Sequence, residues 1–126
     1  MNHPASDEIR KEQKKQIMNK TQELLDLILN SEDYILYKKE REELKQSENL
    51  YAKMNEFRRK SLEMQLSGQE GVNFENLQEL YNEYSETLME PQVSKFMNKE
   101  QSICKLLRKV QDRISHGVDL DTSYME

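Results

Sequence analysis

The chain has 126 residues, a formal net charge of −5, one cysteine and only 35% hydrophobic residues. One domain with a small core is expected at this length. The single cysteine excludes an internal disulfide, the acidic balance argues against a nucleic-acid-binding protein, and no segment is apolar enough to cross a membrane. We therefore expect a cytoplasmic protein without a signal peptide, whose thin core is completed by a second subunit.

Helical periodicity runs through most of the chain. A flexible N-terminal arm of residues 1–8 is expected to precede a first helix over residues 9–30. Ser31 is the expected N-cap of a second helix, because acidic residues follow it where the helix dipole favours negative charge. Ser47 either caps a third helix or merely interrupts one long rod formed by the second and third helices.

Glycine and proline mark the element boundaries in the second half of the chain. Gly68 and Gly71 bracket the expected turn, since glycine accepts the positive φ angles that end helices. A fourth helix is expected over residues 73–89. Pro91 then suits the first position of a fifth helix, which should close on Gly117.

These elements predict an all-α protein with one helical domain over residues 9–117 and an irregular tail over residues 118–126. We expect an antiparallel bundle of four to five amphipathic helices, with long hairpin-like helices and a core completed by oligomerisation. The fourth helix has an acidic face opposite its apolar stripe, which is interpreted as solvent-exposed. Its members are Glu75, Glu79, Glu83, Glu86 and Glu90.

The fifth helix has a basic stripe beside its apolar seam. At 100° per residue, five cations and one leucine fall within an arc of about 120°. The stripe comprises Lys95, Lys99, Lys105, Leu106, Lys109 and Arg113. It is either a solvated flank or a surface where charge steers a partner and the leucine anchors it. A protein partner is favoured over direct RNA binding, because no aromatic residue on this face offers a base-stacking platform.

Three further side chains are candidates for a functional role. Tyr34 and Tyr37 either pack in the core or contact partners. Cys104 is either a packing residue or one ligand of a metal cluster shared across subunits, since one thiol falls short of the four that an iron–sulfur cluster usually needs. There is no phosphate loop, two-histidine helical metal pair or recognisable nucleophile–base arrangement, so we expect neither an enzyme nor a bound cofactor.

Several segments together resemble the YlbF/YmcA family of small helical bacterial regulators. The most specific are a spacing over residues 28–37 and the entry to the last helix. The first places Ile28, Ser31, Tyr34 and Tyr37 three residues apart; the second is Pro91-x-Val93-x-x-Phe96. The resemblance extends over roughly residues 17–120.

The resemblance implies a helical hairpin-like bundle that forms dimers or higher oligomers and catalyses nothing itself. It implies partners among family relatives and unrelated proteins, influence on an endoribonuclease that matures messenger RNA, and effects on competence, sporulation and biofilm formation. It also implies iron–sulfur clusters in some complexes. Our first hypothesis is thus a regulatory adaptor. The alternatives are an RNA-binding accessory factor that uses the basic stripe, and an iron–sulfur or redox sensor built on Cys104.

Overall fold

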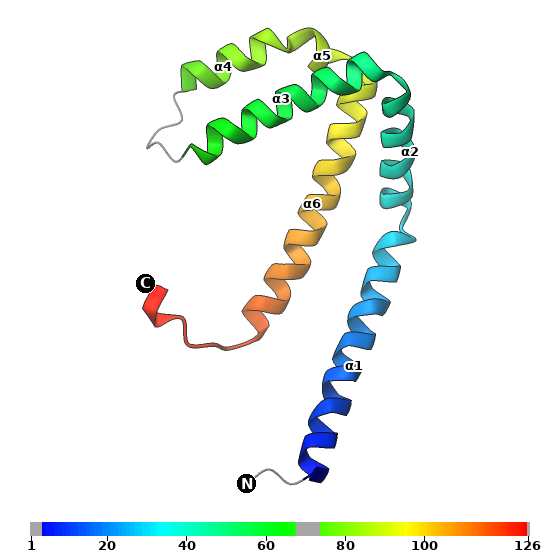
Figure 1. Ribbon diagram of the computed structural model, residues 1–126, viewed down its shortest axis with the longest axis vertical. Coiled ribbons are helices and arrows are strands. Elements are labelled where there is room, and N and C mark those ends of the chain that lie inside the picture. Colours follow the sequence, from blue (N-terminus) through cyan, green and yellow to red (C-terminus); the bar gives the residue numbers. More distant parts are fainter. Residues whose placement is uncertain (1–3, 68–73, 126) are drawn as a thin grey trace. The chain divides into compact units, whose positions relative to one another are not determined.

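The computed structural model describes residues 4–67 and 74–125 (Figure 1). Every regular element in these two stretches is helical, which confirms the predicted all-α class. The elements are α1 (Pro4–Leu29), α2 (Glu32–Gln46), α3 (Glu48–Leu66), α4 (Phe74–Glu83), α5 (Ser85–Met89), α6 (Pro91–Gly117) and a 3₁₀ turn (Ser123–Met125). Contacts divide the chain into two compact units, residues 1–35 and 36–126. No helix in the described stretches is both long and apolar enough to span a membrane.

The first unit consists of α1 and the first turn of α2. Helix α1 begins at Pro4, so residues 4–8, which were predicted to belong to a flexible arm, are helical. Proline is tolerated in the first turn, and Asp7 complements the helix dipole there. Ser31 caps α2 as predicted, because its Oγ accepts a hydrogen bond from the Tyr34 N–H at 3.3 Å. A local capping signal therefore separates α1 from α2.

Ser47 separates α2 from α3, so the two helices do not fuse into one rod. Its φ and ψ angles of −92° and 75° are not helical. Its side chain does not cap α3; the Ser47 hydroxyl instead donates to Gln92 Oε1 on α6 at 3.3 Å. The break is therefore fixed by a contact with α6 as well as by local geometry.

The predicted helix over residues 73–89 is divided at Tyr84 into α4 and α5. Tyr84 has φ and ψ of −103° and 15° and is only 7% exposed. The centres of the Tyr84 and Phe57 rings lie 5.7 Å apart, with Phe57 on α3. The helix therefore breaks at a residue that packs in the core, although no proline or glycine marks the position in the sequence. Helices α4 and α5 run back along α3 (Figure 1). The predicted turn at Gly68 and Gly71 lies outside the described residues.

Helix α6 has the predicted limits, Pro91 and Gly117. In the tail, which was predicted to be irregular, residues Ser123–Met125 form a short 3₁₀ turn. The Asp121 carboxylate accepts hydrogen bonds from the backbone N–H and the hydroxyl of Ser123, at 3.1 and 2.7 Å. These bonds support the 3₁₀ turn, and they lower the pKa of Asp121 below its ordinary value.

The core of the second unit is small and lies where α6 begins. One cluster joins α2, α3 and α6; the other joins α3, α4 and the residue between α4 and α5. The first comprises Leu44, Met54, Val93 and Phe96, and the second Phe57, Leu80 and Tyr84. Beyond Phe96 the apolar seam of α6 continues, but Leu107 and Ile114 are 44% and 58% exposed. The second half of α6 therefore extends past the core.

Candidate functional site: helix α6 and the α3–α4 groove

The basic stripe is largely exposed along α6. Lys95, Lys105, Lys109 and Arg113 are exposed, and Lys99 is half-buried. Leu106, in their midst, is 39% exposed. None of the five cations forms an ion pair within the described parts of the chain, so the positive charge of the stripe is available to a partner.

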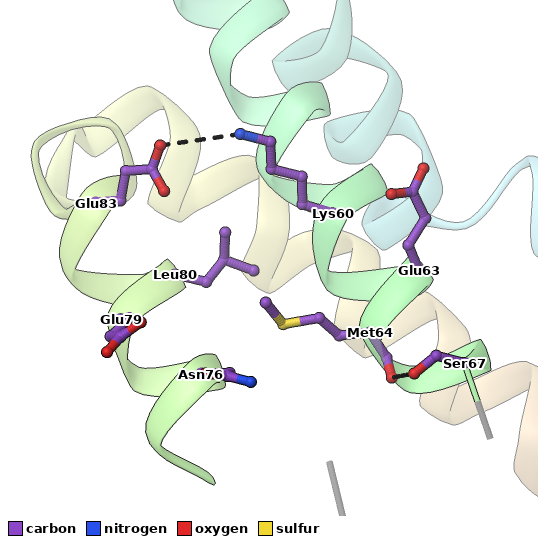
Figure 2. A pocket seen from close by; sticks show the side chains of 8 residues that line it. All are labelled: Lys60, Glu63, Met64, Ser67, Asn76, Glu79, Leu80 and Glu83. Atoms are coloured by element: carbon purple, nitrogen blue, oxygen red, sulfur yellow. Dashed lines mark hydrogen bonds and ion pairs between the residues drawn. The ribbon is translucent and has the colours of Figure 1, made fainter. Parts of the chain in front are cut away.

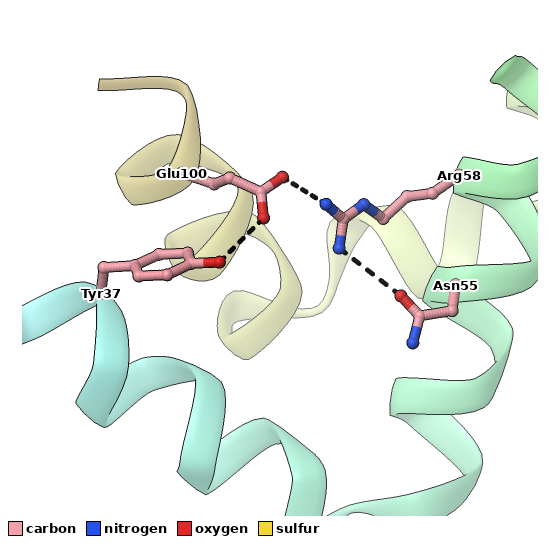
Figure 3. Close-up of polar contacts among 4 residues, drawn as sticks. All are labelled: Tyr37, Asn55, Arg58 and Glu100. Carbon is pink, nitrogen blue, oxygen red and sulfur yellow. Dashed lines mark hydrogen bonds and ion pairs between the residues drawn. The ribbon is translucent and has the colours of Figure 1, made fainter. Parts of the chain in front are cut away.

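Tyr37 is half-buried and packs against the core. Its ring stacks on Phe96 with centroids 5.3 Å apart, and its hydroxyl donates to Glu100 Oε2 at 3.2 Å (Figure 3). Burial raises the pKa of Tyr37, and the nearby Glu100 carboxylate raises it further. These contacts favour the core interpretation of Tyr37. Tyr34, in the first unit, is half-buried.

Glu100 joins three helices. Besides the Tyr37 hydroxyl from α2, its carboxylate accepts a hydrogen bond from the Arg58 guanidinium of α3, which also donates to Asn55 Oδ1 at 3.5 Å (Figure 3). Sequence reasoning missed this network. One signal was available: Glu100 follows Phe96 by four residues, so an acid lies on the apolar side of α6.

A second network links α3 to α4. Lys60 Nζ lies 3.4 Å from Glu56, 3.9 Å from Glu83 and 5.2 Å from the centre of the Tyr84 ring. Contact with the Tyr84 hydroxyl, and then with Lys60, lowers the pKa of Glu56. Contact with the Tyr84 hydroxyl is also the main cause of a raised Lys60 pKa. The polar groups of this network therefore find their ion-pair and hydrogen-bond partners in one another.

A fall in pH should lower the stability of the fold because the Glu56 carboxylate becomes protonated. Its pKa is lower in the folded than in the unfolded chain, so its stabilising effect is complete above the ordinary pKa and is lost as the pH falls through the folded value. Between about pH 6 and about pH 3, the melting temperature of Glu56→Gln should therefore fall less than that of the wild type. Circular dichroism measures both. Glu43→Gln, at an exposed position on α2, should behave as wild type, and equal decreases for Glu56→Gln and wild type would contradict the assignment.

A groove of about 460 Å³ lies between the end of α3 and α4 (Figure 2). Met64 and Leu80 point towards each other across it and form an apolar floor. Its lining residues are Lys60, Glu63, Met64, Ser67, Asn76, Glu79, Leu80 and Glu83. Glu83 pairs with Lys60, whereas Glu63 and Glu79 have no ion pair with any described residue. The groove thus combines an apolar floor with excess negative charge, a feature that the prediction of a plain solvated acidic face did not include.

Cys104 is a free, exposed thiol on α6. Within residues 4–67 and 74–125, no group of three or more His, Cys, Asp or Glu side chains is arranged to hold a metal ion. An iron–sulfur cluster usually needs four thiolates. One chain supplies a single thiol, so an iron–sulfur cluster would need thiolates from other chains.

A family model described as "Control of competence regulator ComK, YlbF/YmcA" matches residues 17–119. The chain belongs to the YlbF/YmcA family. The matched range begins within α1 and ends two residues beyond α6. It therefore includes the basic stripe and both sides of the groove. The name of the YlbF/YmcA family implies a role in the control of the competence regulator ComK. No curated protein and no solved structure gave a significant match to the chain.

Proposed function

We propose that this YlbF/YmcA protein is a non-enzymatic, cytoplasmic regulatory adaptor in competence control, which self-associates and binds other proteins. Modulation of an RNA-processing endoribonuclease, with effects on sporulation and biofilm formation, belongs to the same proposal, and the family resemblance is its support. Family relatives are the expected partners besides a second copy. The single observation that carries the proposal is the incomplete burial of the α6 seam.

The seam begins inside the core and leaves it. Val93 is fully buried and Phe96 is 2% exposed. Further along, apolar residues recur at the spacing of four, three and four residues that is typical of a helix–helix contact. They are Ile103, Leu107, Val110 and Ile114. A second helix packed on this row would bury side chains that water now reaches and would complete the bundle.

Disruption of the seam tests the proposal. Leu107→Asp/Ile114→Asp should convert an associated protein into a monomer, because association would then bury two unpaired carboxylates. Sedimentation velocity over a range of concentrations measures the change. The matched control is Gln101→Asp/Ser115→Asp, which adds the same charge at exposed positions of α6 outside the seam and the stripe.

The control should associate like the wild type. Circular dichroism should show that both double variants retain their helices, because all four positions are exposed on an intact helix. A seam variant that associates normally would contradict the assignment of the surface. A wild type that stays monomeric at every concentration would contradict self-association altogether.

A second candidate is an RNA-binding accessory factor. The observation in its favour is that the five cations of the basic stripe have no ion pair among the described residues. RNA binding through this surface would fall steeply as salt rises and would be lost in Lys105→Glu/Lys109→Glu. Absence of RNA binding at low salt would remove this candidate and leave the protein adaptor.

A further inference from the structure

We infer that the α3–α4 groove is a docking site for the basic stripe on α6 of a second copy of the chain. The inference rests on the proposed self-association but assigns it a second surface, separate from the seam. An apolar floor between acidic edges on one copy would meet a leucine between cations on the other.

The groove supplies the acidic side of this contact. Met64 is half-buried and Leu80 is only 4% exposed, so Met64 supplies most of the apolar surface that a partner can reach on the floor. Glu63 of α3 and Glu79 of α4 also line the groove, and their side chains point outward from the two helices, away from the Met64–Leu80 floor (Figure 2). Both carboxylates are exposed and have no cation paired with them in the described stretches. Lys60 is the one described cation in the lining, and its charge is shared between Glu56 and Glu83.

The stripe supplies a matching helix. Lys105 and Lys109 lie one turn apart on α6, and Leu106 lies on the same side of the helix. A helix placed along the groove would set Leu106 on the Met64–Leu80 floor and leave the cations near the acidic edges. Apolar contact would anchor the complex, while the charges would fix its register and speed the encounter.

The occupant is a second copy because each chain carries both halves of the contact. No ion pair within the described residues joins a stripe cation to a groove carboxylate, so both surfaces remain open to another molecule. The two surfaces differ from each other. Two copies therefore either exchange contacts reciprocally and close as a pair, or add further copies head to tail.

Charge reversal on each side tests the contact. The groove variant is Glu63→Lys/Glu79→Lys and the stripe variant is Lys105→Glu/Lys109→Glu. Each should weaken self-association at low salt by at least about tenfold, since like charges then face each other across the contact. A one-to-one mixture should restore it, because each reversed surface meets an oppositely charged one. The control, Glu12→Lys/Glu43→Lys, makes the same change of charge at exposed positions outside the groove and should associate like the wild type.

Salt separates this contact from the seam. At about 0.5 M salt, screening should remove the part of the association due to the groove and spare the apolar seam. Sedimentation velocity gives the dissociation constant in each condition. Normal association of the groove variant, or no recovery in the mixture, overturns the inference; the seam variant Leu107→Asp/Ile114→Asp then decides separately whether self-association stands. A wild type that is monomeric throughout overturns both.

Discussion

Replacement of Phe96 by alanine is expected to lower the free energy of unfolding by about 3–5 kcal/mol. Phe96 is 2% exposed and lies where α2, α3 and α6 meet. Its ring stacks on Tyr37, and the Arg58 guanidinium lies 5.5 Å from its centre. The variant would lose the transfer energy of the ring and leave a cavity among neighbours that cannot all close around it. Because the core is small, this loss is a large share of the total stability.

Urea unfolding followed by circular dichroism measures the change. Tyr124→Ala is the matched control, because it also removes an aromatic ring, but from a side chain that is 82% exposed. Its free energy of unfolding should stay within about 0.5 kcal/mol of the wild type. A loss below about 1 kcal/mol for Phe96→Ala would mean that Phe96 is not the centre of the core.

The second large effect is expected for Glu100→Ala, which should lower the free energy of unfolding by about 1–2 kcal/mol. The substitution removes the carboxylate that both the Tyr37 hydroxyl and the Arg58 guanidinium contact. Hydrogen bonds to charged groups are among the stronger ones, but the Glu100 and Arg58 side chains are 27% and 35% exposed, and water offsets part of the loss. Tyr37 should also titrate at a lower pH than in the wild type, since one of the causes that raise its pKa is gone.

Urea unfolding and a spectrophotometric tyrosine titration check these two effects. The control is Glu42→Ala, which removes a 61%-exposed carboxylate from contacts with Arg41 and Lys45. It should change the stability by less than about 0.5 kcal/mol, because exposed ion pairs contribute little. The double variant Arg58→Met/Glu100→Ala tests whether the two residues interact. If its loss in the free energy of unfolding equals the sum of the losses in the two single variants, Arg58 and Glu100 are not coupled.

Sequence signals identified the features that short segments determine. Ser31, Pro91 and Gly117 marked helix ends because capping and proline geometry act within one turn. The break at Tyr84 escaped prediction, since the residue packs against Phe57, which lies 27 positions away in the chain.

The same distinction holds for the candidate site. Periodicity identified the basic stripe and the seam of α6, because both repeat along one helix. It did not show that the seam leaves the core after Phe96, since a pattern identifies a face but not what covers it. Arg58 and Glu100 are 42 residues apart, and no local pattern pairs them. The α3–α4 groove likewise needs two helices that the middle of the chain brings together.

The division of α6 into an anchored half and an uncovered half has a consequence for the lifetime of the protein in the cell. The first half is held by the core, whereas the turns beyond Ile103 have few apolar contacts to hold them closed. Those turns should therefore open more readily than the first half of α6, and a bound copy or partner would shield them from proteases. The lifetime of the protein would then depend on its concentration. Unassociated molecules would be degraded, whereas molecules bound to a second copy or to a partner would persist.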